Sequence, residues 1–127
     1  MTPSEYVKLA TVTESKDFAA IAERTGTKEN IRLLHAAIGL CTETGELQDA
    51  LKKAIFYGKP LDKVNLAEEL GDVMWYIAIA CDTLGVSLES VMEKNIAKLT
   101  ARYGDKFSQA AALNRNLDAE RQILETK

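Results

Sequence analysis

The chain has 127 residues, a formal net charge of −3 and 46% hydrophobic residues, which fits one soluble globular domain spanning residues 1–127. Its longest apolar run, residues 73–81, has nine residues, whereas a membrane-spanning helix needs about 20. The first residues lack the basic and apolar regions of a signal peptide, so we expect a cytoplasmic protein with no membrane contact. The acidic balance argues against nucleic acid as a partner.

The cysteines also point to a reducing compartment. Cys41 and Cys81 each lie within an apolar helical pattern, the chain has no CxxC motif, and His35 is its one histidine. We therefore expect two buried thiols, neither a disulfide nor a zinc site.

The predicted fold class is all-α, because only two prolines interrupt a chain rich in Ala and Leu. Residues 4–24 show no single clean period and could form one interrupted helix or two short ones. The sequence Thr25-Gly26-Thr27 then breaks the pattern.

A second helix is predicted over residues 28–57 and ends at Gly58, with Pro60 just beyond. One apolar stripe at helical spacing consists of Leu33, Ala37, Leu40, Leu47, Leu51 and Ile55. A second stripe on roughly the opposite side consists of Ile31, Leu34, Ile38 and Cys41. A helix that is apolar on two sides must pack between neighbours, as in a bundle centre or a subunit interface.

A third helix is expected to begin near Asn65, with Glu68 completing a capping box, and to end at Gly85. Its predicted core stripe is Leu66, Leu70, Val73, Ile77, Cys81 and Leu84. A fourth helix over residues 88–103 follows Ser87 and stops at Gly104. The core of the domain is thus about 28–107. The tail, 108–127, is more polar, and its residues 117–124 could form a short amphipathic helix.

The second and third helices each carry two acidic residues three positions apart: Glu43 with Glu46, and Glu69 with Asp72. This spacing places each pair on one helical face, about 60° apart, at the border of a core stripe. If the two helices pack antiparallel through those stripes, the four carboxylates converge. Oxygen ligands without a His or Cys favour Mg²⁺ or Mn²⁺, and Mg²⁺ is commonly held together with phosphates.

The fourth helix carries Asn95, Lys98 and Arg102 on one face, which could hold phosphate oxygens. Each of these features also has a simpler interpretation, since acidic pairs and basic faces are often only solvated surfaces. Likewise, Trp75 and Tyr76 could be core or interface residues instead of base-stacking groups, and His35 could be structural or a pocket wall.

These residues resemble a known family. Glu43-Thr44-Gly45-Glu46, followed after 22 residues by Glu69-Leu70-Gly71-Asp72-Val73, looks like the ExxE…ExxD signature of the MazG-like, all-α nucleoside triphosphate pyrophosphohydrolases. The sequences of residues 67–76 and 95–104 are also close to those of that family, and the resemblance covers about residues 31–107.

The resemblance implies a four-helix-bundle-type MazG-like fold and Mg²⁺-dependent hydrolysis of (deoxy)nucleoside triphosphates to the monophosphate and pyrophosphate. It implies metal binding and catalysis by Glu43, Glu46, Glu69 and Asp72, and triphosphate binding by Asn95, Lys98 and Arg102. It also implies a homodimer or homotetramer in which two subunits complete each site.

Two alternatives stay open. The chain could be a relative specialised for one nucleotide, such as dUTP, dCTP or a guanosine alarmone. It could also be a non-enzymatic nucleotide-binding helical module.

Overall fold

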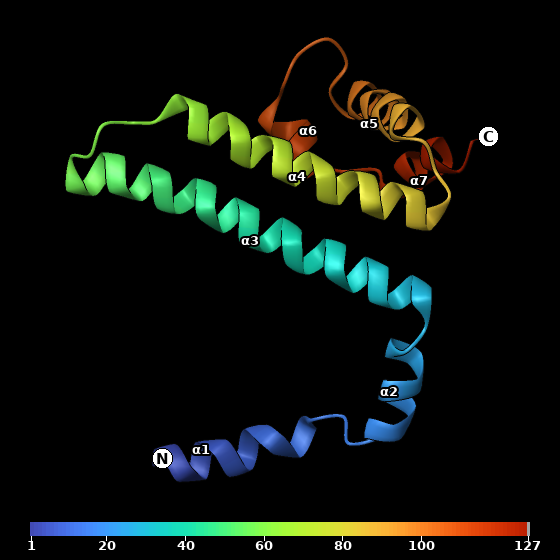
Figure 1. Cartoon of the computed structure of the whole chain (residues 1–127). Coiled ribbons are helices and arrows are strands. Elements are labelled where there is room, and N and C mark those ends of the chain that lie inside the picture. Colours follow the sequence, from blue (N-terminus) through green and yellow to red (C-terminus); the bar gives the residue numbers. More distant parts are fainter. Residues whose placement is uncertain (127) are drawn as a thin grey trace.

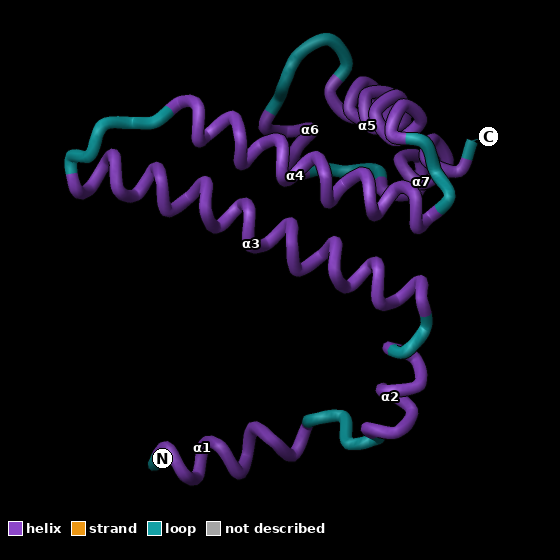
Figure 2. Tube along the Cα trace, viewed as in Figure 1, coloured by secondary structure: helices purple, strands orange, loops and turns teal. Residues whose placement is uncertain are grey.

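All the regular secondary structure in residues 1–126, the part that this computed structural model describes, is helical, and this confirms the predicted all-α class. The tube in Figure 2 shows helices joined by short loops. In chain order the elements are α1 (Pro3–Ala10), the 3-10 turn η1 (Thr11–Thr13), α2 (Phe18–Thr25), α3 (Lys28–Tyr57), α4 (Lys63–Leu84), α5 (Leu88–Tyr103), α6 (Gln109–Leu113) and α7 (Leu117–Glu125).

The N-terminal segment forms two short helices, the second of the two options that the sequence left open. Helix α1 starts with a capping box, in which the Thr2 hydroxyl accepts from the Glu5 amide and the Glu5 carboxylate accepts from the Thr2 amide. In Figure 1 this arm, α1 and α2, turns away from the remaining helices, and α1 buries none of its residues. Helix α2 is the part of the arm that packs on α3.

Helices α3 and α4 form the long antiparallel hairpin that dominates Figure 1. Helix α3 has the predicted bounds and ends at Gly58, whose left-handed φ of 66° suits glycine. The expected start of α4 was wrong, because Asp62 caps the helix by accepting from the Val64 and Asn65 amides. The helix therefore begins two residues earlier than predicted, and Asn65 and Glu68 lie inside it.

The packed face of α3 is rotated from the first predicted stripe. Ala36 and Gly39 are buried, whereas Ala37, Leu51 and Ile55 are exposed. Gly39 occupies one of these contact positions because the ring of Tyr76 on α4 fills the space that a side chain would need. On α4, Cys81 is buried and Val73 and Ile77 are half-buried as expected, but Leu70 and Leu84 are exposed.

After Ser87, which caps α5 as predicted, the chain folds back so that α7 and α6 pack on α5. Gly104 ends α5 with a φ of 64°, as the sequence indicated. Helix α7 confirms the amphipathic helix expected in the tail, while α6 was not predicted.

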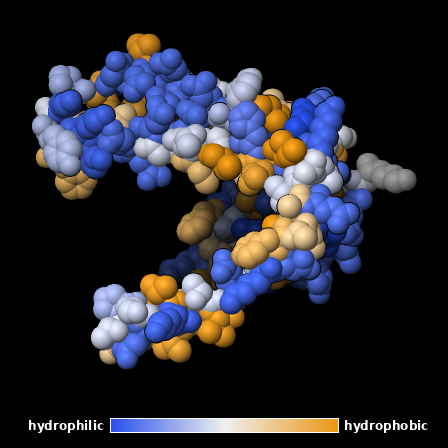
Figure 3. Space-filling view, turned by 60° about the horizontal axis from the view of Figure 1, so that its bottom comes forward, coloured by the Kyte–Doolittle hydropathy of each residue, from blue (hydrophilic) through white to orange (hydrophobic). Residues whose placement is uncertain are grey.

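Much apolar surface stays uncovered on the single chain. All four residues of the second α3 stripe are exposed, so the expectation of a buried Cys41 was wrong, and only the thiol of Cys81 is buried. Figure 3 shows apolar residues on the arm and on the walls of the hollow beside it. The accessible surface is 10122 Å². A compact monomer of this mass exposes about 6,700 Å².

Candidate metal centre

Three acidic side chains meet where α3 faces α4. One carboxylate oxygen from each of Glu43, Glu69 and Asp72 lies within 4.8 Å of the other two. Glu43 comes from α3 and the others from α4, so the antiparallel hairpin brings together residues 26 or more positions apart in the sequence. Three of the four carboxylates that the sequence singled out therefore converge.

The cluster is held in place by neighbouring polar groups. Glu69 is buried, with 6% of its surface exposed, and its Oε1 accepts a 2.8 Å hydrogen bond from Asn65 Nδ2. The Thr42 hydroxyl donates at 3.1 Å to Glu43 Oε1. Glu43 is half-buried and Asp72 is exposed, so the cluster runs from the hairpin interior to solvent.

The three acids, Glu43, Glu69 and Asp72, have no ion-pair partner among the described residues, 1–126. Two ionised carboxylates at 4.8 Å repel each other by about 1 kcal/mol in water and by about 3 kcal/mol at a dielectric constant near 20. An external cation would remove that cost, and three carboxylate oxygens at this separation suit a hard divalent ion such as Mg²⁺.

Glu46, the fourth predicted ligand, lies outside this group of three. It lines a neighbouring pocket of about 600 Å³ to which Glu69 also contributes, so the pocket and the carboxylate cluster share a wall. The remainder of the pocket wall comes from the second half of α3, the α3–α4 loop and the start of α4.

The structure does not bring Asn95 and Lys98 to the carboxylates of the same chain. Both line a different pocket of about 480 Å³, which is mainly apolar and includes Met74 and Ile77 of α4. That pocket shares no residue with the cluster or with the 600 Å³ pocket.

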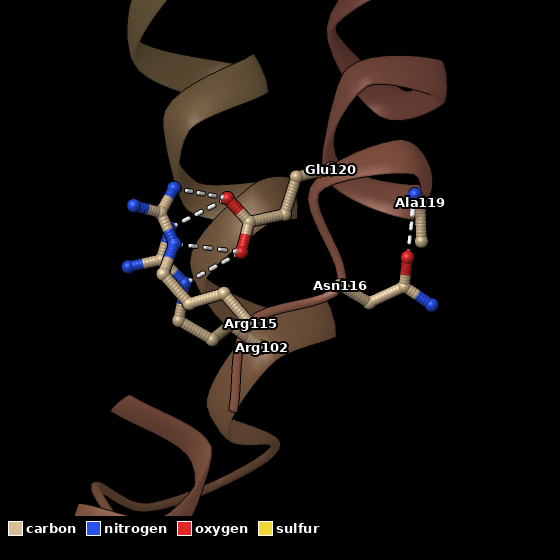
Figure 4. Close-up of polar contacts among 5 residues, drawn as sticks. All are labelled: Arg102, Arg115, Asn116, Ala119 and Glu120. Carbon is tan, nitrogen blue, oxygen red and sulfur yellow. Dashed lines mark hydrogen bonds and ion pairs between the residues drawn. The ribbon is translucent and has the colours of Figure 1, made fainter. Parts of the chain in front are cut away.

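Arg102 was expected to bind phosphate, but in this chain it pairs with Glu120. Its Nε and one terminal nitrogen donate to Glu120 at 2.8 and 2.6 Å, and Arg115 donates to the same carboxylate at 2.7 Å (Figure 4). Hydrogen bonds from the two arginines lower the pKa of Glu120 to about 2. Arg102 therefore fastens α7 to α5 in this chain, and its guanidinium is already engaged.

Sequence reasoning missed two contributors to the site. Gly39 is buried against the ring of Tyr76, and a Cβ at this position would overlap the ring. Asn65 was expected to cap α4 and instead orients Glu69. The sequence did offer a signal for Gly39, since a glycine within a helical pattern often marks a place where a neighbouring group packs closely against the helix. Asn65 gave no comparable signal.

Around Tyr76, three rings are in edge-to-face contact one turn from the carboxylates. Ring centroids lie 5.5 Å apart for His35 and Tyr76 and 4.8 Å apart for Trp75 and Tyr76. Tyr76 is half-buried in the hairpin, while Trp75 and His35 are exposed beside it. These contacts favour a structural role for Tyr76.

Comparison with known proteins agrees with this geometry. The sequence model of the MazG nucleotide pyrophosphohydrolase domain matches residues 33–107, a range that contains the whole carboxylate cluster. The chain is 34% identical over 90 residues to the Gene 37 protein of Mycobacterium phage L5, which covers 65% of this chain and 76% of the phage protein.

It is also 54% identical over 41 residues to the Bacillus subtilis (strain 168) protein named "Uncharacterized protein YvdC", covering 32% of this chain and 39% of that one. No solved structure matches the chain significantly. Among residues 1–126, no helix combines the length and apolar character needed to cross a membrane. The span of the family match and the position of the carboxylates within it show that the chain belongs to the MazG nucleotide pyrophosphohydrolase family.

Proposed function

We propose that the protein hydrolyses (deoxy)nucleoside triphosphates to the monophosphate and pyrophosphate in a Mg²⁺-dependent reaction, with Mn²⁺ as a possible substitute, and thereby controls or clears nucleotides in the cytoplasm. Family membership supports nucleotide pyrophosphohydrolase activity in general. The observation that carries the finer proposal is the convergence of Glu43, Glu69 and Asp72, none of which forms an ion pair with another residue in the range 1–126.

In this proposal the three clustered carboxylates hold Mg²⁺, and Glu46 completes the set from the pocket wall. Bound Mg²⁺ would offset negative charge on the phosphate oxygens. The hydrogen bond that Asn65 donates to Oε1 keeps the Glu69 carboxylate oriented. One carboxylate of the set accepts the proton of the attacking water.

We further propose that a second copy of the chain completes the site. Asn95 and Lys98 lie in a separate pocket of their own chain, so they reach a triphosphate on the carboxylates only from another copy. The large excess of exposed apolar surface supports assembly into a homodimer or a dimer of dimers. Arg102 is left out of the proposed phosphate-binding set because Glu120 already engages it.

The test is a panel of ribo- and deoxyribonucleoside triphosphates, incubated with Mg²⁺ or Mn²⁺, in which monophosphate and pyrophosphate are measured. We expect equimolar release of the two products. Loss of a residue that only supports a metal ligand typically lowers activity by about 10–100-fold. Because Glu69 is itself a proposed ligand, Glu69→Gln should lower turnover by more than that. Glu68→Gln is the matched control, since Glu68 is the preceding, exposed residue outside the cluster, and should stay near wild type.

The outcome also separates the alternatives. Turnover of a single triphosphate, dUTP or dCTP, would identify a specialised relative, and so would turnover of only a guanosine alarmone when it is added to the panel. Nucleotide binding without any turnover, under both metals, would refute hydrolysis and favour the non-enzymatic module.

A further inference from the structure

The 600 Å³ pocket has a basic side that the carboxylate cluster does not explain. It extends from Glu69 and Glu46 past the last turns of α3 to the α3–α4 loop. There its wall includes Lys53 and Lys59. A pocket of this size is in the range that holds a small-molecule ligand.

The end of α3 brings the backbones of the two lysines together. The Lys59 amide donates at 3.2 Å to the Lys53 carbonyl, just after Gly58 has ended the helix in the left-handed conformation. This contact holds the start of the loop against the last turns of α3. Both residues line the pocket at this end.

The charges on this rim leave cationic groups available. Asp49 is shared by Lys52, at 2.5 Å, and by Lys53, so one carboxylate faces two ammonium groups. Hydrogen bonds from these lysines lower the pKa of Asp49 to about 2. Within residues 1–126, Lys59 belongs to none of the ion pairs. The Asp62 carboxylate is occupied by the amides that it caps.

The residues that line the 600 Å³ pocket indicate the kind of ligand that it could bind. Most of the residues that line the wall are charged or polar, and the others are the small residues Gly45, Ala50 and Pro60. It contains no aromatic ring on which a nucleobase could stack. Ammonium groups at one end and metal-binding carboxylates at the other instead match a chain of phosphates.

We propose that this pocket is the subsite for the two outer phosphates of the triphosphate, with Lys59 and Lys53 contacting the group that leaves as pyrophosphate. The inference rests on the proposed hydrolysis and assigns a direction to the substrate. The outer phosphates extend from Glu69 toward the α3–α4 loop, and the nucleoside points away from it.

The two lysines then act on the leaving group. Water oxygen forms a bond to the α-phosphorus, and the bond from that phosphorus to the α–β bridging oxygen breaks. The bridging oxygen departs with the electron pair as part of pyrophosphate, while a carboxylate takes the proton from water. Ammonium groups beside the outer phosphates stabilise the charge that accumulates there.

The experiment compares Lys59→Gln and Lys53→Gln with wild type in two measurements. Calorimetric titration with pyrophosphate in Mg²⁺ buffer measures the affinity of the subsite without turnover. Steady-state kinetics measure KM for the triphosphate and the inhibition constants of both products. Losing one charge-assisted contact should weaken pyrophosphate binding by about 10-fold or more. KM for the triphosphate should rise as pyrophosphate binding weakens, while inhibition by the nucleoside monophosphate stays unchanged.

Lys52→Gln is the matched control, because Lys52 pairs with the same Asp49 yet does not line the pocket. It should bind pyrophosphate as wild type does, and Lys59→Arg should retain most of the affinity. Wild-type affinity in both Lys59→Gln and Lys53→Gln, or an equal loss in Lys52→Gln, would overturn the assignment. Hydrolysis itself is judged by the nucleotide panel, so the two proposals fail on separate measurements.

Discussion

At the scale of single residues, the carboxylates of this chain fall into two contrasting environments. Glu120 is buried between two arginines that satisfy both of its oxygens. Glu43, Glu69 and Asp72 face one another and, within the part of the chain that the structure describes, belong to none of the ion pairs. The first arrangement is complete in the single chain and serves structure, whereas the second is the set of ligands that we propose for a divalent cation.

The Glu120 pair gives a pH-dependent prediction. Because its pKa falls from the ordinary 4.5 to about 2, its ionised form stabilises the fold fully above pH 4.5, and this stabilisation is lost as pH falls toward 2. In Glu120→Gln the side chain cannot ionise, so Arg102 and Arg115 lose their shared carboxylate partner. The gap in melting temperature between wild type and this variant should be widest above pH 4.5 and close as pH falls to about 2.

Thermal unfolding followed by circular dichroism at several pH values measures the gap. Glu125→Gln, on the exposed side of the same helix, is the control and should give a small gap at every pH. A gap for Glu120→Gln that does not change with pH would contradict the assignment of this ion pair.

At the scale of elements, the contact between Gly39 and Tyr76 sets how closely α3 and α4 approach near the carboxylates. The buried glycine provides the space into which the tyrosine ring fits. Glu43 lies one turn further along α3, so a change in the helix separation would also change the separation of the clustered carboxylates.

Gly39→Ala should therefore destabilise the hairpin. The added methyl group overlaps the ring, and overpacking costs about 1–3 kcal/mol, which outweighs the gain of up to about 1 kcal/mol from better helix propensity. Gly71→Ala, where nothing lies within 4 Å of the added carbon, should instead be neutral or stabilising. Urea unfolding at one fixed protein concentration measures both, and greater stability in Gly39→Ala would refute the close contact.

At the scale of the whole molecule, the single chain exposes about half as much surface again as a compact protein of its mass. Helix α1 has eight residues, none of them buried, although isolated helices shorter than about 12–15 residues are marginal in water. The exposed stripe of Ile31, Leu34 and Ile38 adds to this surface. A second copy would cover apolar residues on more than one element.

Sedimentation at micromolar concentration should therefore show a dimer or a larger assembly. Ile38→Glu places a charge in the exposed stripe and should shift the distribution toward monomer, while Gln48→Glu, at an exposed polar position of the same helix, should not. A monomer with full activity would contradict the proposed completion of the site by a second copy.

The sequence by itself determined the all-α class, the ends of the three long helices and a set of four acids that includes the clustered three. Local rules were sufficient here, since glycines ended α3, α4 and α5 where the sequence indicated and the three-residue spacing put each acidic pair on one face. Together with the family signature, this was enough to identify the class of chemistry.

Only the tertiary structure decided the packed face of α3, the separation of Glu46 from the other acids and the engagement of Arg102 by Glu120. Helical periodicity locates an apolar stripe, but which side is buried depends on where small residues admit a neighbouring helix. An ion pair between residues 18 positions apart likewise depends on how α7 folds back onto α5, which no local pattern encodes.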